Sequence, residues 1–314
     1  MTLPGRHGPL RLVHDVTLSL ERGERLGLVG ESGSGKTMTA LALMGLLPEG
    51  ARASGRILFE GEDVVGATEA TLARWRGRRI AMVFQEPMTA LNPLHPIVDQ
   101  IAEPLVWHGL LRPRQARARA IELLERVGLR DAPRRAAAYP HQLSGGERQR
   151  AMIAMALACG PELLIADEAT TALDVTLQRE ILDLIGDLVA ESGMALLLIS
   201  HDLGVMAENS QRVSVMYGGT IIESGPTVDV FARLAHPYTR GLFASRPRLD
   251  GSRGRLPAIP GQVPAPSDMP SGCPFAGRCP LTIAACGAAL PPPVRLGPGH
   301  WARCIRLDVA LEAR

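Results

Sequence analysis

Aromatic residues are scarce in this sequence, and lysine is almost absent. Phe, Trp and Tyr make up 4% of the 314 residues, so the core must be built from aliphatic side chains. The composition, 46% hydrophobic and 21% charged, is typical of a globular chain and excludes extended disorder. The length fits one large domain or two ordinary ones. Of the 34 basic residues only Lys36 is a lysine, which makes this position the first to examine.

Long apolar runs and a strong charge of one sign are also lacking. No uninterrupted run approaches the roughly 18–20 apolar residues that cross a bilayer, and the first ten residues lack the apolar stretch of a secretory signal. We therefore expect neither an integral membrane protein nor a secreted one. The sequence has 34 basic and 32 acidic residues, so the net charge is +2. This balance gives no sign of nucleic-acid or membrane binding, and no nucleic-acid partner is expected.

Cysteine occurs at five positions, four of them close together. Cys159 is isolated in an apolar stretch, and we expect it to be a buried core residue. The other four fall within the last 42 residues, and in an intracellular chain such a cluster favours metal binding over disulfides. Four thiolates can bind a [4Fe–4S] cluster or tetrahedral Zn²⁺. Their gaps are wider than the two to four residues usual within zinc-binding pairs. The four are Cys273, Cys279, Cys286 and Cys304.

The order of predicted elements is typical of an α/β fold with a doubly wound sheet. Alternating apolar and polar residues predict a strand over 10–20, and a second strand over 25–29 runs into a Gly-rich loop and a helix over 37–47. Continuous apolar runs predict buried strands at 163–167 and 194–200. The remaining expected elements are a strand over 78–85, helices over 115–128 and 152–160, and a hairpin over 212–225.

Proline is concentrated near the C-terminus. Twelve of the 25 prolines lie between Pro247 and Pro298, a density that prevents long helices and central strands. We therefore expect a domain boundary near residue 245 and a loop-rich module over 246–314. Such a module has little regular core, and a bound metal would supply the missing constraint.

The Gly-rich loop matches the pattern G-x-x-x-x-G-K-[ST], in which backbone N–H groups and a helix N-terminus converge on phosphate oxygens. In this pattern Lys36 reaches the terminal phosphates of a nucleotide and the Thr37 hydroxyl binds Mg²⁺. Arginine is too bulky and planar to replace this compact charge, which explains the position of the single lysine. The predicted phosphate-binding residues are Gly30, Glu31, Ser32, Gly33, Ser34, Gly35, Lys36 and Thr37.

A second part of a nucleotide site follows the buried strand at 163–167. The strand ends in Asp167 and Glu168. Two charged carboxylates at the end of a buried strand are stable only if water and a cation offset the cost of burying their charge. Asp167 can hold Mg²⁺ through its hydration shell, and Glu168 can polarise the water that attacks the γ-phosphate. Together with the phosphate loop, these residues predict a nucleoside triphosphatase.

Between the two parts lies a second glycine-containing helix start, LSGGERQ. Small residues at the start of a helix form an anion site, but the chain already has a complete phosphate loop, so the second site implies another nucleotide. At this point the chain resembles the ATP-binding subunits of ABC transporters, in which this signature completes the ATP site of the opposite subunit. The matching signature residues are Ser144, Gly145, Gly146 and Glu147.

The resemblance covers essentially the whole chain and assigns three further residues. Gln85, in VFQEPMTALNP, matches the glutamine that senses Mg²⁺ and the membrane subunits. Asp174, in TALD, matches the D-loop aspartate, and His201, in ISHDL, matches the switch histidine that contacts the γ-phosphate. The resemblance thus implies a P-loop ABC ATPase core over 1–245 with a helical subdomain at about 88–160. Its catalytic residues would be Glu168, His201 and Gln85, and its Mg²⁺ ligands Thr37, Gln85 and Asp167.

A narrower resemblance is to the oligopeptide/dipeptide importers, particularly their D-type ATP-binding subunit. It rests on RRIAMVFQEPMTALNP, on YPHQLSGGERQRAMIAMALA and HPYTRGL, and on the cysteine-containing tail. Members of this group carry an iron–sulfur cluster in that tail, which favours [4Fe–4S] over Zn²⁺, free thiols or disulfides here. The signature has Glu147 where the group often has Gln, and Ala169 stands where Pro commonly follows the catalytic Glu.

The resemblance also implies partners and a location. We expect a motor subunit on the cytoplasmic face of a bacterial membrane, bound peripherally to two permease subunits. A second ATPase subunit of the F type and an extracytoplasmic solute-binding protein would complete the importer. Import of nickel or another non-peptide solute is an alternative, and a soluble ABC ATPase of DNA repair or translation is a more distant one.

The N-terminus departs from the family pattern. Family members open with a further strand and an aromatic residue that stacks on adenine, but residues 1–29 contain no Phe, Tyr or Trp. His7 lies near the expected place. We expect that the chain is abridged at its start, through a misassigned initiator Met.

Overall fold

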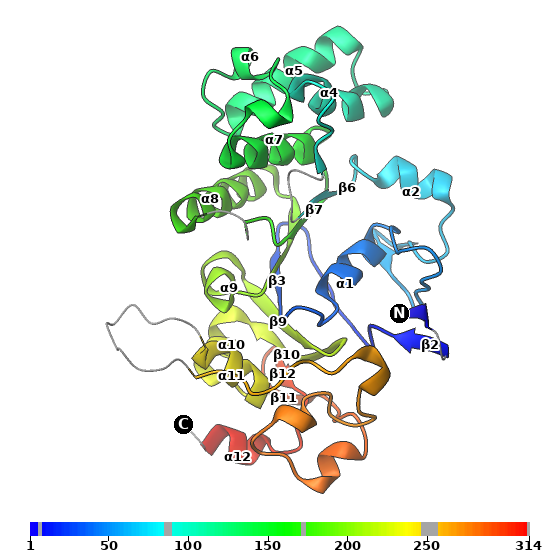
Figure 1. Cartoon of the computed structure of the whole chain (residues 1–314), viewed down its shortest axis with the longest axis vertical. Helices are drawn as coiled ribbons and strands as arrows, with labels where there is room; N and C mark the ends of the chain where they lie inside the picture. The colour runs from blue at the N-terminus through cyan, green and yellow to red at the C-terminus, as the bar shows by residue number, and fades with distance from the viewer. Residues whose placement is uncertain (6–7, 85–89, 171–173, 246–256, 313–314) are drawn as a thin grey trace. The chain divides into compact units, whose positions relative to one another are not determined.

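The computed structural model describes residues 1–5, 8–84, 90–170, 174–245 and 257–312 (Figure 1). The chain divides into two compact units. The first comprises Met1–Ser19, Arg25–Arg56 and Ser200–Arg314, and the second comprises Leu20–Glu24 and Ile57–Ile199. Each unit combines strands with helices, as an α/β protein should.

The first unit is built on a mixed sheet in the strand order β11-β12-β10-β9-β3. β3 pairs with β9 in parallel, whereas β9, β10, β12 and β11 pair antiparallel. A separate hairpin is formed by β1 and β2. The strands are β1 (Thr2–Gly5), β2 (Gly8–Arg11), β3 (Arg25–Val29), β9 (Arg212–Tyr217), β10 (Thr220–Pro226), β11 (Val294–Gly297) and β12 (His300–Ala302). The helices are α1 (Lys36–Leu43), α9 (Leu203–Asn209), α10 (Thr227–Arg233), α11 (Pro237–Ala244) and α12 (Leu307–Glu312).

The second unit contains three parallel strands in the order β8-β7-β6 and a short hairpin of β4 and β5. All five residues of β7 are buried, which explains its continuous apolar sequence. The strands are β4 (Leu58–Phe59), β5 (Glu62–Asp63), β6 (Ile80–Val83), β7 (Leu163–Asp167) and β8 (Ala195–Ser200). The helices are α2 (Glu69–Trp75), α4 (Ile97–Trp107), α5 (Pro113–Arg126), α6 (Ala132–Arg135), α7 (Gly145–Leu157) and α8 (Val175–Ser192).

Helices α4, α5, α6 and α7 gather into one group within the second unit (Figure 1). In α5 the buried residues Ala116, Ala120, Leu123 and Leu124 form the stripe that a helix presents to its neighbours. Gly128, with φ of 75°, follows the end of this helix in the left-handed conformation that favours glycine. The sequence prediction of a helix over 115–128 is confirmed.

Several other predicted elements are confirmed, and the strand predicted over 10–20 is shorter than expected. The strands predicted at 25–29 and 163–167 have those bounds, and the hairpin predicted over 212–225 is formed by β9 and β10. The strand predicted over 10–20 ends at Arg11. Asp15 has φ of 29°, which an extended strand cannot adopt, and His14 donates its N–H to Gly219 O at 2.7 Å instead of to a strand partner.

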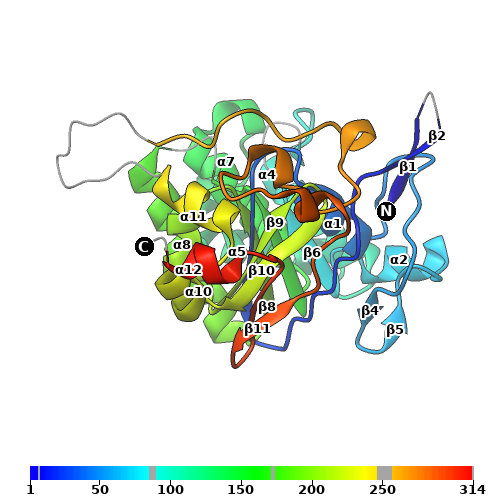
Figure 2. The same ribbon diagram turned by 90° about the horizontal axis from the view of Figure 1, so that it is seen from below.

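The C-terminal segment extends the sheet of the first unit. β12 pairs with β10 at Glu223 and Ser224, and β11 pairs with β12 at the edge of the sheet that Figure 2 shows from below. The fully buried Glu223 carboxylate accepts hydrogen bonds from the N–H groups of Ala235 and His236 and contacts His300 Nε2 at 2.9 Å. This carboxylate therefore joins β10 to the start of α11 and to β12.

Two sequence expectations about burial can be compared with the fold. Cys159 is half-buried, less than the full burial expected, and burial raises the pKa of its thiol to about 11. Within the described ranges, no helix is both long and apolar enough to cross a bilayer.

Candidate functional site

The predicted phosphate loop connects β3 to α1 in the first unit. Gly33 and Gly35 have φ of 80° and 102°, so side chains are disfavoured at both positions. A Cβ atom on Gly30 would lie 2.1 Å from Met216 O at the end of β9. The three glycines of the motif are therefore required by backbone conformation or by close approach, as a loop that wraps around an anion demands.

Lys36 begins α1 and is buried to 5% exposure. Its Nζ donates hydrogen bonds to Gly30 O at 2.7 Å and to Glu31 O at 3.0 Å, which holds the ammonium group over the loop. Ser34 is fully buried, and its hydroxyl has no hydrogen-bond partner among the described residues. Thr37, by contrast, is exposed. The loop thus presents a cation, a buried hydroxyl and an accessible hydroxyl, which are donors and ligands suited to phosphate and Mg²⁺.

Glu31 is held in place by two residues that are distant in the sequence. Its carboxylate accepts two hydrogen bonds from the Arg278 guanidinium, at 2.6 and 3.1 Å, and its N–H donates to the Tyr238 hydroxyl at 2.8 Å. The hydrogen bonds with Glu31 raise the pKa of Arg278, and burial raises that of Tyr238. Sequence reasoning missed both roles, although it singled out HPYTRGL and the residues around Cys279.

The paired carboxylates lie in the second unit, where β7 ends. Asp167 is its last residue and is buried, and Glu168 follows with φ of 46°. The Glu168 N–H donates to Ile199 O at 2.9 Å. This left-handed conformation is rare for a residue other than glycine, and it ends the extended strand at Asp167.

The signature residues form the start of α7 in the second unit. Ser144 is the N-cap: its hydroxyl accepts from the Glu147 N–H at 3.3 Å, and the Glu147 carboxylate accepts from the Ser144 N–H at 2.8 Å. This reciprocal capping box explains why Glu serves at position 147 where the resembled group often has Gln. Gly145 and Gly146 place no side chain over the first turn of α7. A Cβ atom on Gly146 would lie 2.8 Å from the Leu177 side chain, so this position has no room for a larger residue.

Asp174 lies beside this signature. It is the N-cap of α8 and accepts from the Leu177 N–H at 3.0 Å. Asp174, Ser144, Gly145 and Gly146 line one open pocket. The structure thus brings together two sequence-predicted motifs that lie about 30 residues apart in the chain. His201 is exposed and follows directly after β8, and Gln85 lies outside the described residues.

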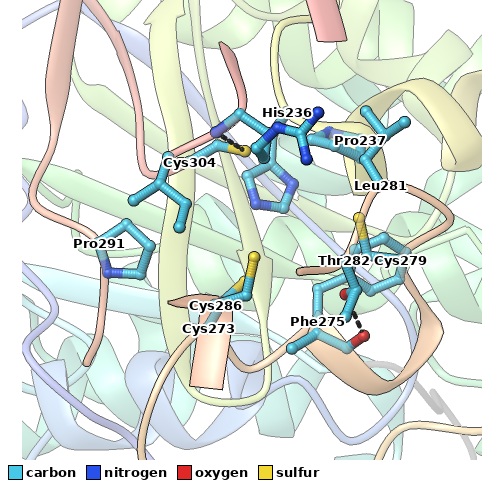
Figure 3. A pocket seen from close by; sticks show the side chains of 13 residues that line it. His236, Pro237, Cys273, Phe275, Cys279, Leu281, Thr282, Cys286, Pro291 and Cys304 are labelled. Atoms are coloured by element: carbon cyan, nitrogen blue, oxygen red, sulfur yellow. Dashed lines mark hydrogen bonds between the residues drawn. The ribbon is translucent and has the colours of Figure 1, made fainter. Parts of the chain in front are cut away.

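The four C-terminal cysteines also share a pocket, in the first unit. Figure 3 shows Cys273, Cys279, Cys286 and Cys304 around the ring of His236, with Phe275 and Leu281 among the apolar residues of the lining. Burial lowers the pKa of His236 to about 4, so the ring is neutral. Burial likewise raises the pKa of Cys273 to about 11. None of the five cysteines, all of which lie in the described ranges, forms a disulfide.

Backbone groups are directed at three of these sulfurs. The Arg306 N–H donates to Cys304 Sγ at 3.3 Å, and backbone hydrogen bonds from Phe275 and Leu281 favour the thiolates of Cys273 and Cys279. Such hydrogen bonds are a usual feature of sulfur ligands to metal clusters, so the donor set fits an iron–sulfur group. However, within the described part of the chain no three His, Cys, Asp or Glu residues lie close enough together to hold a single metal ion.

The fold and the phosphate loop define the class of protein: a P-loop ATPase of the ATP-binding cassette type. Comparison with known families agrees. Residues 13–171 match the family model described as ABC transporter, and residues 222–286 match the oligopeptide/dipeptide transporter C-terminal region. The chain therefore belongs to the ABC transporter family, among the ATP-binding proteins that carry this C-terminal region.

Individual relatives are similar over nearly their whole length. A Brucella melitensis protein named for peptide import and ATP binding is 52% identical over 307 residues, which cover 94% of this chain and 91% of the relative. The oligopeptide transport ATP-binding protein AppD of Bacillus subtilis is 46% identical over 298 residues, with coverage of 94% and 91%. Among solved structures, the cassette MJ0796, as a dimer in a post-hydrolysis state bound to ADP and Pi, has a TM-score of 0.65 and 28% identity. The structural match covers 72% of this chain and 95% of the MJ0796 chain.

Proposed function

We propose that this chain is the ATP-hydrolysing subunit of a bacterial importer for di- and oligopeptides. The observation that carries the proposal is the phosphate loop, with its single lysine buried over the loop carbonyls, in a chain that also has the peptide-transporter C-terminal region. The relatives named for peptide import support the choice of solute.

The residues of the site have distinct proposed roles. Lys36 and the loop N–H groups bind the phosphates of ATP, and Glu168 polarises the attacking water while His201 contacts the γ-phosphate. Mg²⁺, held by Thr37, Asp167 and Gln85, would neutralise charge that develops on the phosphates. Ser144, Gly145 and Gly146 bind the nucleotide of a second ATPase subunit, with Asp174 beside them. The exposure of Ser144 and Gly145 at the start of α7 supports this role, because the N-terminus of a helix attracts an anion.

We propose that the chain acts at the cytoplasmic face of the membrane with several partners. These are an F-type ATPase subunit, two permease subunits and an extracytoplasmic solute-binding protein. The dimeric state of the related cassette supports the pairing of two ATPase subunits. The division of the chain into an ATPase domain over 1–245, with a helical subdomain near 88–160, and a module over 246–314 also remains our proposal. The composition change near residue 245 supports it.

In the C-terminal module we propose a [4Fe–4S] cluster with Cys273, Cys279, Cys286 and Cys304 as ligands, and Zn²⁺ as the alternative metal. The shared pocket and the hydrogen bonds to sulfur support this proposal. Protein purified without oxygen should be brown and contain iron, and replacing two of the cysteines with Ser should remove both properties. Colourless, iron-free protein that contains zinc would favour the alternative metal.

Hydrolysis by the purified chain tests the enzymatic part of the proposal. The wild type should hydrolyse ATP in a Mg²⁺-dependent reaction, and Glu168→Gln should slow it by at least about 100-fold while ATP binding persists. Glu122→Gln is the matched control, because Glu122 is an exposed carboxylate that forms an ion pair with Arg119 on the surface of α5. Equal hydrolysis rates in the Glu168→Gln variant and the control would overturn the assignment of Glu168.

A further inference from the structure

The segment from Pro257 to Cys304, here called the cysteine segment, contacts the phosphate loop through the side chain of Arg278. We propose that Arg278 of this segment is a positioning residue for the phosphate loop, so that nucleotide affinity depends on how the cysteine segment is folded. The proposal rests on the proposed function as an ATPase, and it assigns a role in that activity to a residue 247 positions away from Glu31.

The contact between Arg278 and Glu31 is short, bidentate and shielded. Arg278 Nη1 lies 2.6 Å from Glu31 Oε2 and Nη2 lies 3.1 Å from Oε1, and the Arg278 side chain is only 7% exposed. Bidentate guanidinium–carboxylate pairs fix orientation as well as distance, and shielding from water strengthens them. The carboxylate of Glu31 is therefore fixed relative to the cysteine segment.

The cysteine segment in turn fixes Arg278. The guanidinium donates to Pro260 O at 2.8 Å and to Gly261 O at 3.2 Å. It also donates to the Tyr217 hydroxyl at 3.2 Å. Arg278 is the last residue of a short 3-10 helix (Ala276–Arg278) and directly precedes Cys279, whose side chain lines the cysteine pocket. Any rearrangement of this turn must move the guanidinium.

Glu31 connects this guanidinium to the phosphate-binding lysine. Its carbonyl oxygen accepts a hydrogen bond from Lys36 Nζ at 3.0 Å, and its N–H donates to the Tyr238 hydroxyl at 2.8 Å. Glu31 is thus held at its side chain, its N–H and its carbonyl. Because the residue is fixed at three points, the loop can keep its conformation before a nucleotide arrives, which lowers the entropic cost of binding.

Aromatic packing makes the connection rigid. The rings of Tyr217, Tyr238 and Phe275 pack edge to face, with centroids 4.6 to 5.3 Å apart. Tyr238 is the second residue of α11, and Phe275 belongs to the cysteine segment between Cys273 and Cys279. The hydroxyl that holds the Glu31 N–H and the turn that carries Arg278 therefore rest on the same cluster.

The first test is nucleotide affinity in variants of the full chain. Arg278→Ala should weaken binding of Mg-ATP by about tenfold, the scale of a typical coupling between sites, and should raise the KM for ATP more than it lowers kcat. Arg278→Lys keeps the charge but loses the bidentate geometry, so it should recover only part of the affinity. Arg303→Gln is the matched control, because the Arg303 guanidinium donates to Asp15 and to the Pro291 carbonyl, and among the described residues no hydrogen bond joins it to the loop.

A double-mutant cycle separates positioning from simple support of the fold. If Arg278 acts through Glu31, Arg278→Ala should have no further effect on affinity in a Glu31→Ala background. If it only supports the cysteine segment through Pro260 and Gly261, the tenfold loss should persist in that background. Additive losses would therefore overturn the proposal.

Because coupling between two sites is reciprocal, the cysteine segment should also respond to nucleotide. Adding Mg-ATP should slow amide hydrogen exchange across residues 273–279 in the wild type, and the effect should disappear in Arg278→Ala. Wild-type chain that fails to bind ATP at all would count against the proposed function. Normal ATP binding with unchanged affinity in Arg278→Ala would leave that function intact and overturn the positioning role.

Discussion

At the scale of single residues, Lys36 shows how much one side chain can determine. It is the only lysine of the chain, it is buried, and its ammonium group rests on two carbonyl oxygens of the loop that it serves. These carbonyls hold the charge where a phosphate would arrive, so binding requires little rearrangement.

Replacing Lys36 tests this arrangement. Lys36→Ala should reduce ATP affinity by at least about 100-fold, because it removes a charge-assisted contact to phosphate from a shielded site. Lys36→Arg should restore little of this affinity, since a planar guanidinium does not fit between Gly30 O and Glu31 O. Titration with a fluorescent ATP analogue gives the affinities, and circular dichroism checks the fold. Full affinity in Lys36→Arg would contradict the requirement for a compact cation.

The residue scale is also where the sequence was least informative. The pattern of the phosphate loop identifies Gly30, Lys36 and Thr37, because their spacing is local. The pair between Arg278 and Glu31 and the buried bonds of Glu223 join residues that lie 247 and up to 77 positions apart. No periodicity or motif encodes which distant side chains meet, so these contacts became visible only in the fold.

At the scale of elements, capping residues explain where helices begin. Ser144 and Asp174, which the sequence analysis assigned to nucleotide binding, are the N-caps of α7 and α8. A capping side chain satisfies one N–H group of the first turn, and the remaining N–H groups of a helix N-terminus suit an anion. The capping role is observed at both positions, and the nucleotide-binding role is the one that we propose for them.

The cap of α8 can be tested apart from its function. Asp174→Ala should lower the free energy of unfolding by about 1 kcal/mol, because the Leu177 N–H loses its acceptor. Asp174→Asn should keep the cap and remain within a few tenths of a kcal/mol of the wild type. Urea unfolding followed by circular dichroism measures both values. Equal losses in the two variants would show that the cap does not stabilise this helix.

The start of β7 depends on an ion pair whose contribution varies with pH. Glu162 accepts from Arg79 Nε at 2.7 Å and from Arg22 Nη2 at 2.7 Å, and the hydrogen bond from Arg79 lowers the pKa of Glu162 against the opposing effect of burial. The folded-state pKa thus lies below the ordinary value of about 4.3. The stabilisation is complete above that value and is lost as the pH falls through the folded-state pKa.

Glu162→Gln should therefore cost about 1 kcal/mol of unfolding free energy at pH 7 and clearly less at pH 3.5. Glu191→Gln is the control, because Glu191 pairs with Arg126 at an exposed position and should cost a few tenths of a kcal/mol at most. Urea unfolding at the two pH values measures the difference. A cost for Glu162→Gln that grows as the pH falls would contradict the lowered pKa.

Element boundaries follow local rules where the chain is regular and tertiary contacts where it is not. The buried strands at 25–29 and 163–167 and the helix ending before Gly128 were predictable from apolar runs and glycine. The helix predicted over 37–47 ends at Leu43, because Gly45 adopts φ of 62° and terminates it. The strand predicted over 10–20 ends at Arg11, although apolar and polar residues continue to alternate beyond it. The positive φ of Asp15 and the hydrogen bond from the His14 N–H to Gly219 O are incompatible with an extended strand there.

At the scale of the whole molecule, the phosphate loop and the cysteine segment belong to the same unit and contact each other through Arg278 and the aromatic cluster. The two family matches therefore describe parts that are physically connected, not two independent modules. The site and the family together predict that ATP hydrolysis by this chain drives peptide import.

The most direct test is the uptake of labelled di- and oligopeptides by cells whose only copy of this subunit is the wild type or Glu168→Gln. We predict that the wild type supports uptake and that the variant abolishes it, with both proteins present at equal levels in the membrane fraction. Equal peptide uptake in the two strains, with hydrolysis by the purified variant lost, would contradict the account and direct the search to another solute.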